Sequence, residues 1–353
     1  MKKKIALMLS LLAVLLVFAG CTSQSADSRN LLSQPIEDSR FLIGTNVSIR
    51  IWDKDKEEVL ERAYALIQEI GDKIDTNNNI NSQLDQVNAA SGKHPVVIDE
   101  DVFWMVQKAV SYAQMSNGVF DPTIGPITNL WRIGFDDARK PSQAEIDEKL
   151  KLVNYQWVTL NEKDHSVFLE KEGMRLDLGA IAKGGICDLV VRFLKENGVT
   201  TAIVDLGGNI FVMGHSSRGE DTAWNVGIQD PNRARSVVIF TLPGVNQSFV
   251  TSGIYERYLD VDGVRYHHLL DPQTGYPFDN NLASVSIVSD ESIDGDGLST
   301  TIFGLGLEAG MQHIEEQPGV EAVFVTKDNK VYVTSGLKDE FALPEGSDFT
   351  MGH

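Results

Sequence analysis

The sequence predicts an α+β fold. Strand-like runs gather mostly in the second half of the chain, and helical patterns are interspersed among them irregularly. A doubly wound sheet would instead alternate strand and helix along the chain. Several strand-like runs are spaced as antiparallel hairpins, such as 256–260 and 264–268 around Asp262-Gly263.

Helices are predicted where apolar residues recur at helical spacing next to capping residues. In the first, Asp55 and Glu58 offer a capping-box-like start, and in the third Ser142 and Glu145 have the S-x-x-E spacing just after Pro141. In chain order, the predicted helices are 55–74, 100–117, one beginning at Ser142, roughly 180–197 and roughly 296–315.

Strands are predicted where short runs rich in β-branched and aromatic residues lie between turn residues. These runs are 43–51, 156–160, 166–169, 201–206, 209–213, 224–229, 236–241, 248–251, 256–268, 283–288, 320–326 and 330–334.

The N-terminus has the pattern of a secretory signal. Lys2, Lys3 and Lys4 precede an apolar run that is shorter than the ~20 residues of a membrane span. The sequence LVFAGC (16–21) resembles the bacterial lipobox, whose cysteine is acylated. We therefore expect a signal peptide at 1–20, a lipidated Cys21 with a polar tether to residue 38, and a location on the extracytoplasmic face of a bacterial membrane. The alternative is an ordinary signal peptide with an incidental cysteine.

Composition and charge limit the possible partners. The chain has 353 residues, 42% of them hydrophobic and 23% charged, as in a globular protein. The formal net charge is −19, and removal of the three signal lysines makes it about −22, which argues against nucleic acid as a partner. If Cys21 is lipidated, Cys187 has no partner for a disulfide, and its apolar helical context predicts a core residue.

The segment 175–190 has features of a phosphate site. A strand-like entry ends at Gly179, and a helix with Lys183 in its first turns follows. The N–H groups and the positive dipole end of a helix start suit a phosphate group. The alternative is a glycine-tolerant helix with an exposed lysine.

The segment 294–301 offers hard-oxygen ligands. Asp296 and Thr300 are four residues apart and so share one helix face. A carboxylate and a hydroxyl suit Mg²⁺ completed by waters and phosphates. Alternatively, Asp296 simply caps the helix.

The segment 266–277 contains a candidate general base. His267, His268 and Asp271 lie close together, and a histidine near neutral pKa can accept a proton from a hydroxyl nucleophile. Strand neighbours face opposite ways, so one of the two histidines is expected to be structural. The alternative is a hairpin end at which Asp271-Pro272 begins a turn.

Taken in order, six segments closely resemble the ApbE family, the FAD:protein FMN transferases. They are GVFDPTIGPITNLW (118–131), RLDLGAIAKGG (175–185), VDLGGNI (204–210), VTSGIYERY (250–258), HHLLDPQTGYP (267–277) and DGLSTTIFGLG (296–306). The resemblance implies a single domain over 39–345, with a mixed, largely antiparallel sheet and packed helices.

The resemblance also implies residue roles. Mg²⁺ would bind Asp296, Thr300 and the backbone carbonyl of Ala182, with His268 as the base and Lys183 on the phosphates. The flavin and nucleotide contacts would be Asn78, Phe120, Asp121, Asp177, Lys183, Ser252, Gly253 and Glu256.

The implied reaction uses FAD as substrate and an exported acceptor flavoprotein with a modifiable Thr or Ser as partner. At Asn78, the best match in TNNN (76–79), many relatives have a tyrosine that packs on the flavin. Its absence is expected to weaken FAD retention and to leave room for water as acceptor. Water as acceptor would give one alternative, an FAD pyrophosphatase that releases FMN and AMP. The other alternative is a flavin-binding lipoprotein without catalysis, against which the weaker FAD retention argues.

Overall fold

The computed structural model describes residues 29–77, 81–339 and 341–352. The predicted signal peptide 1–20, the lipidation site Cys21 and the flavin contact Asn78 lie outside these ranges. Within them, no helix is long and apolar enough to cross a bilayer.

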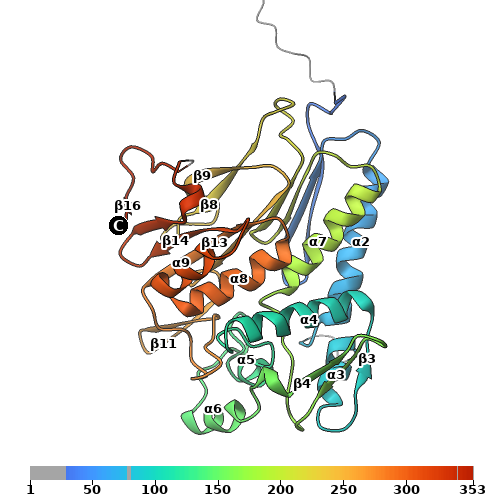
Figure 1. Ribbon diagram of the computed structural model, residues 1–353, viewed down its shortest axis with the longest axis vertical. Coiled ribbons are helices and arrows are strands. Elements are labelled where there is room, and N and C mark those ends of the chain that lie inside the picture. Colours follow the sequence, from blue (N-terminus) through green and yellow to red (C-terminus); the bar gives the residue numbers. More distant parts are fainter. Residues whose placement is uncertain (1–28, 78–80, 340, 353) are drawn as a thin grey trace, which may run out of the picture.

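A nine-stranded sheet forms the centre of the described chain (Figure 1). Its neighbouring strands are all antiparallel, except for one short parallel pair at the β16 edge. In spatial order the strands are β1 (Ile36–Leu42), β2 (Thr45–Ile51), β6 (Ala202–Leu206), β7 (Asn209–Met213), β10 (Gln247–Gly253), β13 (Leu282–Ser289), β14 (Glu321–Thr326), β15 (Lys330–Val333) and β16 (Thr350–Met351). The predicted mixed, largely antiparallel α+β fold is confirmed.

The two faces of this sheet pack against different elements, because successive strand residues point to opposite sides. In β14, Ala322 and Phe324 join the core on the helical side, whereas Val323 and Val325 join a second cluster on the other side. The helices on the first side are α2 (Glu57–Ile74), α4 (Glu100–Met115), α7 (Ala182–Glu196), α8 (Ser292–Leu305) and α9 (Leu307–Glu315). The hairpin β8 (Trp224–Gln229) and β9 (Val238–Gly244) contributes its apolar residues to the second cluster.

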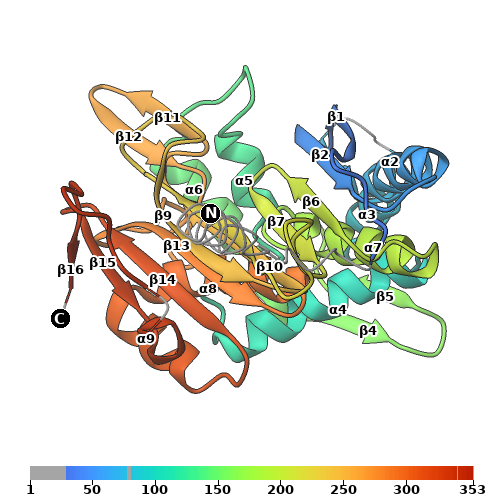
Figure 2. The same cartoon turned by 90° about the horizontal axis from the view of Figure 1, so that it is seen from above.

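A third apolar cluster, around Trp131, joins two helices and a hairpin. It brings together α5 (Gly125–Trp131), α6 (Gln143–Leu150) and the hairpin β11 (Tyr258–Val261)–β12 (Val264–His267). Figure 2 shows this hairpin projecting from the sheet. The other elements are α3 (Gln83–Ala89), β3 (Val96–Val97), β4 (Val158–Asn161), β5 (Ser166–Leu169) and the 3₁₀ turns η1 (Tyr155–Trp157) and η2 (Ser335–Leu337).

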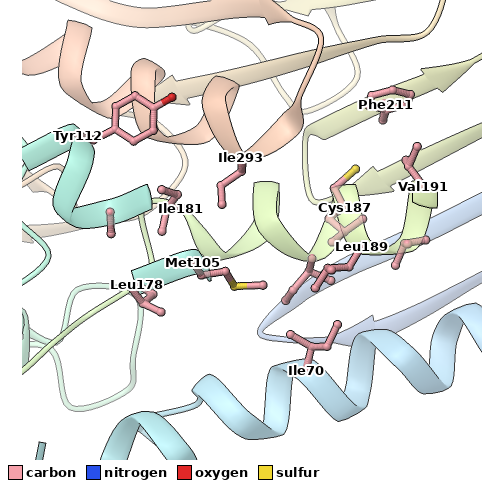
Figure 3. Packing of buried hydrophobic residues seen from close by; sticks show 14 of the residues in the cluster. Ile70, Met105, Tyr112, Leu178, Ile181, Cys187, Leu189, Val191, Phe211 and Ile293 are labelled. Atoms are coloured by element: carbon pink, nitrogen blue, oxygen red, sulfur yellow. The ribbon is translucent and has the colours of Figure 1, made fainter. Parts of the chain in front are cut away.

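Most predicted elements are present. The predicted capping-box-like start at Asp55 and Glu58 is wrong, because α2 begins at Glu57 and its N-cap residue, Lys56, makes no side-chain cap. Other local signals act as expected. Ser142 and Glu145 form a complete capping box at the start of α6. Asp262 and Gly263 both have positive φ, as a tight hairpin turn requires. Cys187 is fully buried among apolar side chains of α7 and neighbouring elements, and burial raises the pKa of its thiol well above the usual value (Figure 3).

The predicted helix 296–315 is wrong in two respects. It begins earlier, at Ser292, and it is split into α8 and α9 at Gly306. Gly306 has φ 80°, a conformation that glycine adopts without steric cost and that ends a right-handed helix.

The predicted domain boundaries, 39 and 345, fall inside the folded body. The expected tether 21–38 ends within β1, which pairs along its length with β2. Arg29 already donates hydrogen bonds to the carbonyls of Ser216 and Gly219, both at 2.8 Å. At the other end, β16 adds to the sheet at Thr350–Met351.

Candidate active site

The central feature of the site is an ion pair between the starts of two helices. Lys183, in the first turn of α7, places Nζ 2.9 Å from Oδ1 and 3.3 Å from Oδ2 of Asp296 on α8. Gly184 N donates to Asp296 Oδ2 at 3.0 Å. Asp296 is 2% exposed, and two donors from α7 take the place of water at its carboxylate.

This arrangement excludes the alternative that Asp296 caps its own helix. Because α8 begins at Ser292, Asp296 lies in its second turn and its carboxylate reaches the N-terminus of α7 instead. The α7 start has no side-chain cap of its own, so Asp296 supplies one from another helix.

Hydroxyl groups lie next to this pair. Thr300 is half-buried and one turn beyond Asp296 on α8. Ser252 on β10 lies with its Oγ 2.8 Å from Ser299 Oγ and 3.5 Å from Thr300 Oγ1. The predicted residues Lys183, Asp296, Thr300 and Ser252 therefore come from three elements to one place. Gly253 follows Ser252 at the end of β10 and is buried.

His268 lies at the base of the β11–β12 hairpin. Its backbone N donates to Arg257 O at 3.1 Å, and its ring Nδ1 lies 3.2 Å from the same oxygen. Partial burial of the ring lowers the pKa of His268, and the positive charges of Arg257 and Lys183 lower it further. The imidazole is thus neutral at pH 7.

His267, by contrast, points into the core. It is 6% exposed, its Nε2 lies 3.1 Å from Phe278 O, and its ring meets Phe303 edge-on. Burial lowers the pKa of His267 to about 4. Its contacts are those of a structural residue, so His268 stays the candidate base of the two histidines.

Phe120 and Asp121 are buried and contact the protein itself. Phe120 packs on Tyr112 with ring centroids 6.1 Å apart. Asp121 accepts from Thr123 N at 2.8 Å and from Tyr155 N at 3.0 Å, and burial raises the pKa of this carboxyl. In this arrangement both residues shape the loop that leads to α5.

Asp177 organises the turn that enters α7. Its Oδ1 accepts from Gly179 N at 2.8 Å, and its Oδ2 accepts from Thr128 Oγ1 at 2.7 Å. Glu256, half-buried, pairs with Arg235. Neither carboxylate contacts the Lys183–Asp296 pair directly.

The described residues contain no cluster of three or more His, Cys, Asp or Glu side chains suited to a metal. The predicted set differs, since it has one carboxylate, one hydroxyl and the carbonyl of Ala182, the first residue of α7.

Two hollows flank the segment that follows His268. One of about 310 Å³ includes Asp121 and Pro272 in its lining. The other, of about 560 Å³, is lined in part by Phe278 and Gly304. Neither is lined by the Lys183–Asp296 pair, so both are separate from the predicted metal and phosphate site.

Sequence reasoning missed a second carboxylate at the same junction. Asp188 on α7 accepts from Ser292 N and Ile293 N, the first two residues of α8. The signal in the sequence is weak: Asp188 is an acidic residue within the apolar stretch Ile186–Val191 of the helix. It could not be assigned a partner 104 residues away along the chain.

Comparison with known proteins gives consistent matches over most of the chain. Residues 43–324 match the sequence model of the ApbE family. A protein from Klebsiella pneumoniae (strain 342), named FAD:protein FMN transferase, is 39% identical over 304 residues, covering 86% of this chain and 93% of that protein. One of the same name from Treponema pallidum (strain Nichols) is 37% identical, with 85% and 87% covered. The crystal structure of the ApbE protein from Thermotoga maritima superposes with a TM-score of 0.78 at 30% identity, covering 87% of this chain and 99% of that one.

Proposed function

The chain belongs to the ApbE family and is an FAD:protein FMN transferase, and we propose that the junction of α7 and α8 carries out this reaction. The observation that supports this location is the Lys183–Asp296 pair, in which the Asp296 carboxylate is buried. The charge of Lys183 also contributes to the lowered pKa of His268. A phosphate-binding cation, a hard-oxygen ligand and a neutral base are then within one site.

In this proposal, Lys183 and the N-terminal end of α7 hold the pyrophosphate of FAD. The lysine ammonium and the positive end of the helix dipole attract phosphate oxygens and stabilise the charge that develops on them. On substrate binding, Lys183 turns from Asp296 toward the phosphates. Its side chain is 31% exposed and can therefore reach a bound ligand, whereas the Asp296 side chain is 3% exposed and stays in place.

The residues at this junction fit Mg²⁺. Asp296 is a buried carboxylate that already requires a cationic neighbour, and the Thr300 hydroxyl follows on the same helix face. Together with the Ala182 carbonyl they offer the hard oxygens that Mg²⁺ prefers. When bound, Mg²⁺ would neutralise charge on the pyrophosphate as AMP leaves.

His268 is proposed as the general base. It accepts the proton of a Thr or Ser hydroxyl on the acceptor protein, and that oxygen forms a bond with the phosphorus of the FMN half. The anhydride bond to the AMP half breaks, and AMP leaves with the bonding electron pair. The product is FMN in a phosphoester link to the acceptor.

We also propose that the protein is lipid-anchored through Cys21 on the extracytoplasmic face of a bacterial membrane. The lipobox-like LVFAGC (16–21) after a basic and apolar start supports this. Stable anchoring needs two or more acyl chains, since one chain binds only weakly. The acceptor flavoprotein must then be exposed on the same side of the membrane.

The test is direct. The chain from Thr22 onward is incubated with FAD, Mg²⁺ and a protein that carries a family-type acceptor threonine. We expect a fluorescent acceptor band on a denaturing gel that requires both Mg²⁺ and Asp296. FMN and AMP without a labelled acceptor would indicate pyrophosphatase activity, and intact FAD would contradict an enzymatic role under these conditions.

A further inference from the structure

At the junction of α7 and α8, a carboxylate on each helix accepts hydrogen bonds from the first residues of the other helix. Asp188 Oδ1 accepts from Ser292 N at 2.7 Å, and its Oδ2 accepts from Ile293 N at 2.8 Å. The residue before α8, Glu291, makes no side-chain cap. Because the first N–H groups of a helix lack partners within the helix, Asp188 satisfies two of them from α7.

The opposite contact comes from Asp296. This carboxylate, on α8, accepts from Gly184 N in the first turn of α7, whose N-cap residue Ile181 also makes no side-chain bond. Each helix is therefore capped by a carboxylate of the other. The backbones are in close contact here, since a Cβ at Gly184 would lie 2.3 Å from Ser292 O.

We propose that Asp188 is a positioning residue for flavin transfer: it fixes the start of α8 on α7 and so holds Asp296 and Thr300 in register with Lys183. This inference rests on the function proposed above for those three residues. Asp296 lies one helical turn after Ser292, and Thr300 lies a further turn on. A shift at the α8 start is therefore transmitted along a rigid helix to both oxygen ligands.

Asp188 is not the only residue that holds α8 in place. A substitution at Asp188 should therefore change the position of α8 relative to α7 more than it changes folding. Asp294, on the α4 side of α8, accepts from Lys108 Nζ at 2.8 Å and from Tyr112 OH at 2.6 Å. Ser292 Oγ is also hydrogen-bonded to Ser248 Oγ of β10 at 2.8 Å. These contacts are expected to keep α8 folded and docked when Asp188 is changed.

The test uses Asp188→Asn, which keeps the shape and loses one acceptor oxygen. Displaced metal-orienting residues typically change metal affinity or activity by roughly 10–100-fold. We expect a change of that size both in the Mg²⁺ concentration for half-maximal transfer and in Mg²⁺ affinity, measured calorimetrically with ADP as a diphosphate without flavin.

The matched control is Asp53→Asn. Asp53 Oδ2 accepts from Thr200 N and Thr201 N, both at 2.9 Å, so the same kind of double contact is weakened away from the α7–α8 junction. Its Mg²⁺ requirement is expected to stay at the wild-type value. An Asp188→Asn protein that melts like Asp53→Asn and keeps wild-type Mg²⁺ affinity and requirement overturns the proposal.

A second variant decides the question if Asp188→Asn does not fold. Gly184→Ala places a methyl group against Ser292 O and separates the same two helix starts. It should shift Mg²⁺ affinity in the same direction, and an unchanged affinity in this folded variant overturns the proposal. Wild-type protein that transfers no FMN would contradict the proposed function instead, so the two failures are distinguishable.

Discussion

Lys183 Nζ lies 2.9 Å from Asp296 Oδ1, and this contact joins residues 113 positions apart in the chain. The ammonium satisfies a carboxylate that is almost fully buried, while remaining partly exposed itself. A partly exposed cation next to a buried anion can leave the carboxylate for a phosphate once a metal ion neutralises that carboxylate.

Lys183→Met should lower the melting temperature in the absence of Mg²⁺, because it leaves Asp296 with Gly184 N as its remaining donor. Breaking a buried pair costs about 3–5 kcal/mol, and the partial exposure of Lys183 should reduce this. Added Mg²⁺ should restore much of the loss by supplying the missing charge. Lys151→Met, in an exposed pair with Glu148, is the control; equal melting of both variants without Mg²⁺ would contradict the prediction.

Asp296→Asn should slow FMN transfer by roughly 10²–10³-fold, by analogy with the loss of one stabilising group at a charged transition state. Asp294→Asn is the matched control, since it removes a carboxylate from the same stretch of α8 that faces Lys108 and Tyr112. It should lower thermal stability yet keep transfer dependent on Mg²⁺. Full Mg²⁺-dependent turnover by Asp296→Asn would remove the metal assignment.

His268→Asn should affect the reaction rate, whereas His267→Asn should affect stability. The loss of a general base typically costs 10²–10⁴-fold in rate, so His268→Asn should lower kcat by about that factor with little change in melting temperature. His267→Asn should instead lower the melting temperature, because its buried ring packs against Phe303. Steady-state kinetics with thermal melts separates the two, and a nearly wild-type rate for His268→Asn would show that another group takes the proton.

The pH dependence of stability should report on Asp188. Burial raises the pKa of its carboxyl to about 7, and the negative charges of Glu291 and Asp294 add to this. Tyr112 and Lys108 of α4 contact Asp294, and Lys108 also pairs with Glu291. A raised folded-state pKa means that the native protein binds this proton more tightly than the unfolded chain does. Its contribution to stability is present near pH 4 and is lost as pH rises toward 7.

The difference in unfolding free energy between wild type and Asp188→Asn should therefore fall across this window. The slope approaches about 1.4 kcal/mol per pH unit between the ordinary carboxyl pKa and the raised one, because there the native and unfolded states differ by one bound proton. Denaturant unfolding at pH 5 and pH 8 measures it. Parallel stability curves for the two proteins would show that Asp188 titrates at its ordinary value.

Cys187 should be inert in the native protein. The thiolate is the reactive form of cysteine, and burial raises the pKa of the Cys187 thiol well above its usual value. In the chain from Thr22 onward, iodoacetamide should label this position only after denaturation. Rapid native labelling, detected by intact mass, would mean that α7 opens readily.

The amino-acid sequence by itself determined the features that depend on near neighbours. The capping box of Ser142 and Glu145 starts α6, and Asp262-Gly263 turns the β11–β12 hairpin, because the hydrogen bonds and dihedral angles involved span only a few residues. The four-residue spacing of Asp296 and Thr300 likewise fixed their common helix face. The resemblance of the six segments then indicated the family.

Sequence periodicity failed where the local pattern is weak or misleading. β1, IEDSRFL, alternates between half-buried and exposed residues and was not recognised, because an edge strand has little apolar content of its own. The apolar pattern of α8 continues into α9, so the sequence predicted one helix, whereas the structure breaks it at Gly306, where φ is positive.

Only the tertiary structure decided which distant residues meet. It assigned Asp296 to the α7 N-terminus instead of its own, buried His267 and left His268 as the candidate base, and brought Asp188 to the start of α8. Caps and helix faces follow from neighbours a few residues apart. The partner of a side chain on another element is set by how whole elements pack, and no local pattern records that.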